Sequence, residues 1–384
     1  MYYMRYVGPA TRWRCAFTGA AIIAFLFCLQ AASPPTSEAQ SVVRFEAEVR
    51  SLSARMDWAQ EVARSRSFDS HWVVYSIRRM MGENSWIGSF GRDWREAPTL
   101  ESVLTGTIPG SPGQAESLRN AAQEALDRAN GQRSDRKVEK DVAVLFRFHG
   151  ARLDEVDLSN LDLHFDFEDV PVIWLGAAED RESIDLLSAS YAAASDDDCR
   201  EDLVAAVGMH DDVALVRPFL LDIIESRAPE DVRADAVFWL HRDESPESVR
   251  YLARLAEDDR ADEVREQAVF ALSRMAREDA LDRLIALARF DGDDDVREDA
   301  RFWLGQKASS VLVGNVDDDG ESSNLQKQAV FALTQMDDGG IAELIELVHH
   351  HANPVVRKQA LFWLGQSEDE RALETIIAVL RPGS

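Results

Sequence analysis

The sequence predicts a mainly α-helical protein, in which an α-solenoid of stacked helical hairpins follows a small mixed α/β module. Two observations predict this fold. A short apolar pattern recurs about every 31 residues in the second half of the chain, and strand-like alternation of apolar residues precedes it. We expect a signal peptide over residues 1–39, an N-terminal helix and a small β-containing module over 40–165, and the solenoid over 166–384.

Composition limits the classes of partner. The chain has 384 residues, of which 46% are hydrophobic, enough for a sizeable core and too many for a disordered chain. Its formal net charge is −27. Nucleic acid and anionic membrane surfaces would repel such a protein, and the excess charge favours either solubility or a basic partner.

The first 39 residues have the pattern of a secretory signal. Three arginines precede an apolar run over residues 15–32, and a stretch with small residues follows. Cleavage after Ala39 would release a periplasmic or extracellular protein. The alternative is a chain anchored in the membrane by residues 15–32, because this run has the minimum length of a spanning helix.

Cysteine usage agrees with a mature chain that has no disulfide. Cys15 and Cys28 belong to the predicted signal, and the bulky residues before Cys28 differ from those of a lipid attachment site. Only Cys199 would remain. Carboxylates surround it in the sequence and should raise its pKa, so we interpret it as a structural thiol.

Five copies of the pattern Ala-x-Phe-x-Leu form the repeat. An aliphatic residue lies four positions before each copy, and arginine follows this residue in four of the five. Weaker copies are found at 203–208 and 171–176. One hairpin cannot bury its own apolar face, so the units are expected to stack. The five copies are residues 236–240, 268–272, 300–304, 329–333 and 360–364.

Each unit is predicted to contain two helices. In one unit the first runs from 263 to about 275, and the second is expected over 280–290. Ser245 and Asn353, each directly before a proline, are expected to cap helices. Helix ends are also expected at Gly305 and Gly365. The arginines of the first helices can pair along the stack.

The pattern aliphatic-Arg-x-x-Ala-x-x-x-Leu-Gly, followed by a second helix rich in Ala and Leu, resembles the short bacterial HEAT-like repeat of the phycobilisome-lyase type. The resemblance covers about residues 168–384. It implies an α-solenoid and a non-catalytic scaffold that binds another protein, without a cofactor. Because a few members are lyases, an accessory lyase-like or cofactor-handling protein that uses the concave face is the alternative.

A helical wheel explains the bulky consecutive residues of the first helix. With the aliphatic residue as position 0, positions 0, 4, 7 and 8 fall in one arc of about 100°. We expect this arc to be core. Position 7 alternates between large and small residues, so neighbouring units can interdigitate. The large residues at position 7 are Trp239, Trp303 and Trp363.

A phenylalanine at position 6 lies about 150° from the centre of the core arc. Stacking of the units would align these side chains in a column. The column either packs between neighbouring elements or forms an exposed patch that binds a partner. The candidate partner-binding residues are Phe238, Phe270, Phe302, Phe331 and Phe362.

The N-terminal module is predicted from shorter patterns. Residues 42–66 have the apolar spacing of an amphipathic helix, which we expect to dock on the same chain, with the phenylalanine column as one candidate surface. A further helix is expected near 114–129. Residues 151–163 are interpreted as part of a strand pair rather than a pentapeptide coil. Strands are predicted at the start of 71–81, at 142–149 and at 161–167.

No catalytic motif is recognisable, and the metal patterns are weak. Asn315, Asp317 and Asp319 are spaced as in a calcium loop, but Gln326 replaces the glutamate that closes such a loop. We interpret them as an acidic turn. The histidines at 349–351 are interpreted as a solvated turn, because consecutive residues at a helix end point apart. A membrane-tethered adaptor that retains its first helix is a further alternative, and the oligomeric state is left open.

Overall fold

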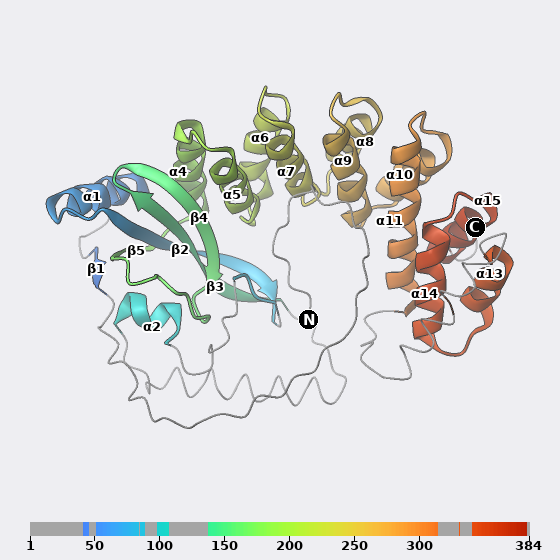
Figure 1. Cartoon of the computed structure of the whole chain (residues 1–384), viewed down its shortest axis with the longest axis horizontal. Coiled ribbons are helices and arrows are strands. Elements are labelled where there is room, and N and C mark those ends of the chain that lie inside the picture. The colour runs from blue at the N-terminus through green and yellow to red at the C-terminus, as the bar shows by residue number, and fades with distance from the viewer. Residues whose placement is uncertain are drawn as a thin grey trace, which may run out of the picture. The chain divides into compact units, whose positions relative to one another are not determined.

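The computed structural model describes residues 41–45, 51–83, 85–88, 98–106, 137–313, 330 and 340–381. Contacts group the chain into two compact units, residues 1–216 and 217–384 (Figure 1). The first unit therefore extends beyond residue 165, where the sequence analysis placed the end of the β-containing module. Within the described residues, no helix is both long and apolar enough to cross a membrane.

The first unit is built on a five-stranded sheet in the order β1-β5-β2-β3-β4 (Figure 1). β5 runs parallel to its neighbours β1 and β2, whereas β3 is antiparallel to both β2 and β4. The sheet is thus mixed, as predicted. Its strands are β1 (Val42–Arg44), β2 (Ser70–Gly82), β3 (Lys137–His149), β4 (Arg152–Asn160) and β5 (Val172–Ala177).

Three strand predictions are confirmed, and one repeat prediction is wrong. β2, β3 and β4 occur where strands were expected. Residues 171–176, interpreted as a weak copy of the repeat, instead form most of β5. Val172 and Ile173 are fully buried, because β5 lies inside the sheet with both faces covered. A short, wholly apolar run fits such a strand as well as a buried helix.

The prediction of a strand at 161–167 is wrong, although its alternation is real. Leu163 and Phe167 are buried, but this segment is not part of the sheet. Instead, the Leu163 carbonyl accepts a hydrogen bond from the amide of Leu100, the first residue of α2 (Leu100–Thr105). Phe167 packs edge-on against Trp72 of β2. The segment therefore fills the core beneath the sheet and caps α2.

Residues 42–66 are not one helix, because β1 precedes α1 (Leu52–Ser65). α1 docks on the same chain, as expected, but its surface is β2, β5 and α4 rather than the phenylalanine column. Leu52 and Ala59 are fully buried there. Arg55 donates to the Leu175 carbonyl at 2.8 Å and so ties α1 to β5. The predicted helix at 114–129 lies outside the described residues.

Two further helices complete the first unit, α4 (Asp180–Ala193) and α5 (Asp197–Gly208). A buried chain of hydrogen bonds joins α4 to the sheet. Tyr75 of β2 and His210 each lie 2.8 Å from the Ser183 hydroxyl. His210 Nδ1 donates to the Ala206 carbonyl, so its Nε2 accepts the Ser183 proton. The first helices beyond β5 are therefore anchored to the sheet by polar contacts.

The second unit consists of helical hairpins, which confirms the predicted solenoid (Figure 1). The first helices α7, α9, α11 and α14 pack in succession, and α8 packs on α10. α6 (Val213–Ile224) spans the boundary between the units. The remaining helices are α7 (Glu230–Leu240), α8 (Pro246–Asp258), α9 (Asp262–Arg274), α10 (Glu278–Phe290), α11 (Asp294–Val313), α13 (Ile341–His350), α14 (Pro354–Gly365) and α15 (Glu370–Leu380).

The aliphatic and alanine positions of the predicted core arc are confirmed in α9, where Val264, Ala268 and Ala271 are fully buried. The two predicted caps are also present. Ser245 accepts a hydrogen bond from the Ser248 amide, and Asn353 accepts one from the Val355 amide. These caps set the starts of α8 and α14.

Gly365 ends α14, as predicted, but Gly305 lies inside α11 rather than at its end. The physical reason is a close crossing of the two helices. A Cβ atom on Gly305 would lie 2.8 Å from the Gly365 Cα, and one on Gly365 would lie 3.1 Å from the Gly305 Cα. The glycine pair therefore allows the backbones of α11 and α14 to touch.

Candidate functional site

Aromatic rings form a continuous line across the first helices of the repeats. Phe238 of α7 stacks on Phe270 of α9, with centroids 5.8 Å apart and planes at 14°. Phe270 lies 4.4 Å from Trp303 of α11. Phe302 then packs edge-on against Trp303 at 4.9 Å and Phe362 of α14 at 6.1 Å. We call these five rings the aromatic ladder.

Phe302 and Phe362 belong to repeats that are not adjacent in the sequence, but their rings are in contact in the ladder. The contact follows from the crossing of α11 and α14 at their glycines. Phe331 itself lies outside the described residues.

The phenylalanines of the ladder are neither core nor fully exposed. All four are half-buried, so each ring packs on its neighbours and leaves part of its surface accessible. Trp303 is also half-buried, although position 7 was expected in the core. Its large ring extends from the edge of the core arc onto Phe270. The partner-binding role of the ladder stays a prediction.

Carboxylates lie on the ladder side of the same helices. Positions −1, 2 and 3 of the wheel point to within about 60° of position 6. On α9 these positions include Glu263 and Glu266, and on α11 they include Asp295 and Asp299. Together with Asp231 of α7 they form what we call the acidic row.

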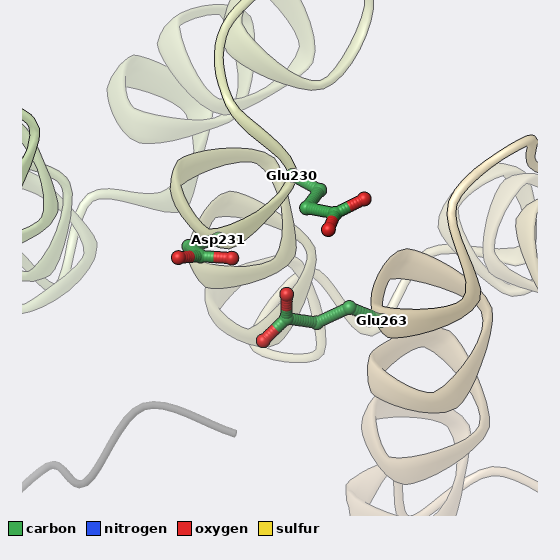
Figure 2. Close-up of side chains that lie close together, drawn as sticks. All are labelled: Glu230, Asp231 and Glu263. Atoms are coloured by element: carbon green, nitrogen blue, oxygen red, sulfur yellow. The ribbon is translucent and has the colours of Figure 1, made fainter. Parts of the chain in front are cut away.

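The acidic row is continuous between helices. Glu263 extends from the start of α9 toward Glu230 and Asp231 at the start of α7 (Figure 2). One carboxylate oxygen from each of these residues lies within 4.8 Å of the others. Hard cations such as Ca²⁺ take oxygen ligands, so these three side chains are the described residues best placed to contact a cation.

Burial, together with crowding of like charges, raises the pKa values in the acidic row. Burial and the hydrogen bond with Asp231 raise the pKa of Glu263 to about 8. Burial, with the charge of Glu266 next, raises the pKa of Asp299 to about 7. Helix N-termini should lower the pKa of nearby carboxyl groups, so burial and crowding outweigh the helix dipole here.

Positive charge gathers at the opposite ends of the first helices. Arg274 occupies position 10 of α9, on the side of the helix that carries position 6, and Arg242 follows the end of α7. Burial lowers the pKa of His241, and the charges of these two arginines lower it further. Burial, followed by the charge of Arg274, also lowers the pKa of Lys307. We call Arg242 and Arg274 the cationic pair.

Of the other sequence candidates, His349, His350 and Cys199 are among the described residues. Asn315, Asp317 and Asp319 lie outside the described residues. His349 and His350 are exposed at the end of α13, which agrees with a solvated turn. Cys199 is buried, and burial, together with Asp202, raises its pKa to about 11. This agrees with a structural thiol.

The acidic row was not among the predicted site residues. Acids at the start of a helix are usually explained by the helix dipole alone. The signal that reveals the row is the same wheel that reveals the phenylalanines, because positions −1, 2 and 3 lie beside position 6. The contact between Glu263 and Asp231, however, depends on how two helices pack.

Comparisons with known proteins agree with this architecture. The fold and its stacked hairpins define the second unit as a helical-repeat structure. Residues 217–305 match the family model of HEAT repeats, and residues 356–381 match that of the PBS lyase HEAT-like repeat. These segments therefore belong to the HEAT-like repeat family, as the resemblance predicted. A comparison with curated proteins finds no match.

Among solved structures, the chain is similar to human deoxyhypusine hydroxylase in complex with glycerol. The two are 19% identical, and the similarity covers 53% of this chain and 80% of that chain, with a TM-score of 0.23. At this level the similarity supports no statement about activity.

Proposed function

We propose that this protein is an exported, non-catalytic scaffold whose HEAT-like repeats bind another protein through the aromatic ladder. The observation that supports the proposal is the line of half-buried rings from Phe238 to Phe362. Partly exposed aromatic side chains supply contact area at low entropic cost and are enriched at protein interfaces. The ladder offers such area across four first helices, α7, α9, α11 and α14.

The negative charge of the chain favours a basic partner. A net charge of −27 repels acidic proteins and attracts basic ones. The acidic row brings part of this charge beside the ladder. We therefore propose a partner with apolar side chains for the rings and positive side chains for the carboxylates.

Capture of the partner tests the proposal. The bait is the chain from residue 40 onward, crosslinked in the cell that exports it, beside a variant with Phe270→Ser and Phe302→Ser. The control is Phe290→Ser, because Phe290 of α10 is 80% exposed and is not part of the ladder. The double variant should lose a specific protein that the control retains, with circular dichroism and melting unchanged.

Two other results would contradict the proposal. Early melting of the double variant would show that the ladder rings stabilise the core rather than bind a partner. Capture of a small-molecule cofactor in place of a protein would favour the lyase-like alternative.

Export is proposed from the pattern in residues 1–39. Sequencing of the mature N-terminus tests it, and Gln40 is the expected first residue. A chain that retains residues 15–32 and stays in the membrane fraction would instead support the membrane-tethered adaptor.

A further inference from the structure

We propose, on the basis of the function proposed above, that the partner presents an amphipathic helix that lies along the aromatic ladder, with a basic edge against the acidic row and an acidic edge against the cationic pair. The proposal rests on three features of the first helices. They are the direction of the ladder, the width of the face and the separation of the charges.

The ladder sets the direction and length of the partner helix. Its ring contacts pass from α7 to α9, α11 and α14, so the apolar surface crosses the helices instead of following one of them. Neighbouring helices pack about 8–10 Å apart, so three steps cover about 24–30 Å. A helix of about 18 residues has this length.

The width of the face fits a helix better than an extended strand. On α9, Glu263 of the acidic row lies at position −1 and Arg274 of the cationic pair at position 10, so about 16 Å of helix separates them. A helix with its side chains is about 10–12 Å wide, and long charged side chains extend its reach on both edges. Neighbouring strands in a sheet are less than 5 Å apart, so one strand would leave one charged row uncovered.

The charges on the two sides are sorted. Glu263 is surrounded by Asp231, Glu230 and Glu266, and Asp299 is surrounded by Glu266, Glu298 and Asp295. At the other end, burial lowers the pKa of His241, and the cationic pair lies close enough to lower it further, against the smaller opposing effect of Glu244. Each of these two carboxyl groups meets like charges from the neighbouring helix as well as from its own. Positive charge on one edge of a partner relieves this repulsion, and negative charge on the other edge is attracted to the cationic pair.

A consequence of this arrangement is that binding should release protons. In the free protein the pKa of Glu263 is about 8 and that of Asp299 is about 7, so both carboxyl groups are partly protonated near neutral pH. Lysines of a bound helix favour the charged carboxylates and lower these pKa values. Affinity should therefore rise as the pH is raised from 6 to 9.

Two synthetic peptides of 18 residues test the proposal by calorimetry. Both carry the same leucine stripe and equal numbers of lysines and glutamates. In the sorted peptide all lysines lie on one edge and all glutamates on the other, whereas in the control peptide each edge is mixed. The sorted peptide should bind at least tenfold more tightly. Titrations at pH 7.5 in phosphate and in Tris should show proton release.

Charge variants identify the site. Glu263→Gln with Asp299→Asn should weaken the sorted peptide about tenfold and remove proton release. The matched control, Glu278→Gln with Asp258→Asn, changes two acids of α10 and α8 that lie outside the acidic row. It should change neither the affinity for the sorted peptide nor the proton release. Arg274→Glu should weaken the sorted peptide but not the mixed one.

The outcomes separate this inference from the proposed function. If both peptides bind equally and Phe270→Ser abolishes the binding of both, the ladder is a binding site, and the proposal that the partner carries its charges on separate edges is wrong. If Phe270→Ser has no effect and neither peptide binds, both proposals fail. The inference would also be overturned if the variant with Glu263→Gln and Asp299→Asn still bound the sorted peptide more tightly than the control peptide.

Discussion

Arg233 of α7 and Asp259, which follows α8, form a buried bidentate ion pair. The two terminal guanidinium nitrogens donate to the two carboxylate oxygens at 3.1 and 2.6 Å, and the side chains are 7% and 8% exposed. Arg233 Nε also donates to the Ile224 carbonyl at the end of α6. One arginine thus links three helices, which explains why this residue type recurs at position 1 of the repeat.

Arginines at position 1 make similar hydrogen bonds and ion pairs in the later repeats. Arg265 donates to the Asp259 carbonyl, six residues before it, and pairs with Asp293 of the next unit at 2.7 Å. Arg297 donates to the carbonyl of Asp291 in the same way. The expectation that these arginines pair along the stack is confirmed for Arg233 and Arg265.

Arg233→Ala is expected to destabilise the chain by about 3–5 kcal/mol, because it leaves the Asp259 carboxylate buried without its partner. Urea unfolding followed by circular dichroism measures the free energy of unfolding. Arg250→Ala is the control, since its ion pair with Glu247 is exposed and contributes little. A loss of the same size in both variants would contradict the role of the buried pair.

Glu263→Gln is expected to stabilise the chain at pH 8 and to leave it unchanged at pH 4. The folded pKa of about 8 is above the ordinary value of 4.5, so the folded state binds a proton more tightly than the unfolded state. Stability is therefore full below pH 4.5 and is lost as the pH rises toward 8. The gain at pH 8 should be roughly 1 kcal/mol after allowance for solvent screening.

Thermal melting of both proteins between pH 4 and pH 8 measures this effect. The difference in melting temperature should grow steadily with pH. A constant difference would show that crowding of carboxylates is not its source.

Gly305→Ala is expected to destabilise the second unit by about 1–3 kcal/mol. Alanine favours a helix over glycine, but its Cβ would meet the Gly365 backbone at 2.8 Å, and overpacking outweighs the gain in propensity. Gly292→Ala is the control, because nothing lies within 4 Å of a Cβ at that position. Equal urea midpoints for the two variants would show that α11 and α14 do not cross closely in solution.

The Cys199 thiol should react with a thiol reagent only after unfolding. It is 1% exposed, and its pKa of about 11 leaves little thiolate at pH 8. The chain from residue 40 onward is the appropriate sample, because Cys199 is then its one cysteine. Rapid labelling of the folded chain, compared with the same chain in urea, would show that the first unit opens around α5.

Much of the fold could be predicted, because the repeat positions each element relative to its copies. The wheel placed Val264 and Ala268 in the core, and the prolines after Ser245 and Asn353 marked helix starts. The predictions failed where local pattern was ambiguous. Residues 171–176 are apolar on every side, and such a run becomes a strand only because β1 and β2 flank it.

The sequence by itself determined the period of the repeat, the face of each first helix and the residues on it, since these follow from 100° per residue. Only the tertiary structure decided which residues of different helices meet. Phe302 contacts Phe362 because two glycines allow α11 and α14 to cross closely, and Glu263 contacts Asp231 because α9 packs beside α7. Periodicity describes one helix at a time, whereas the ladder and the acidic row depend on distances between helices.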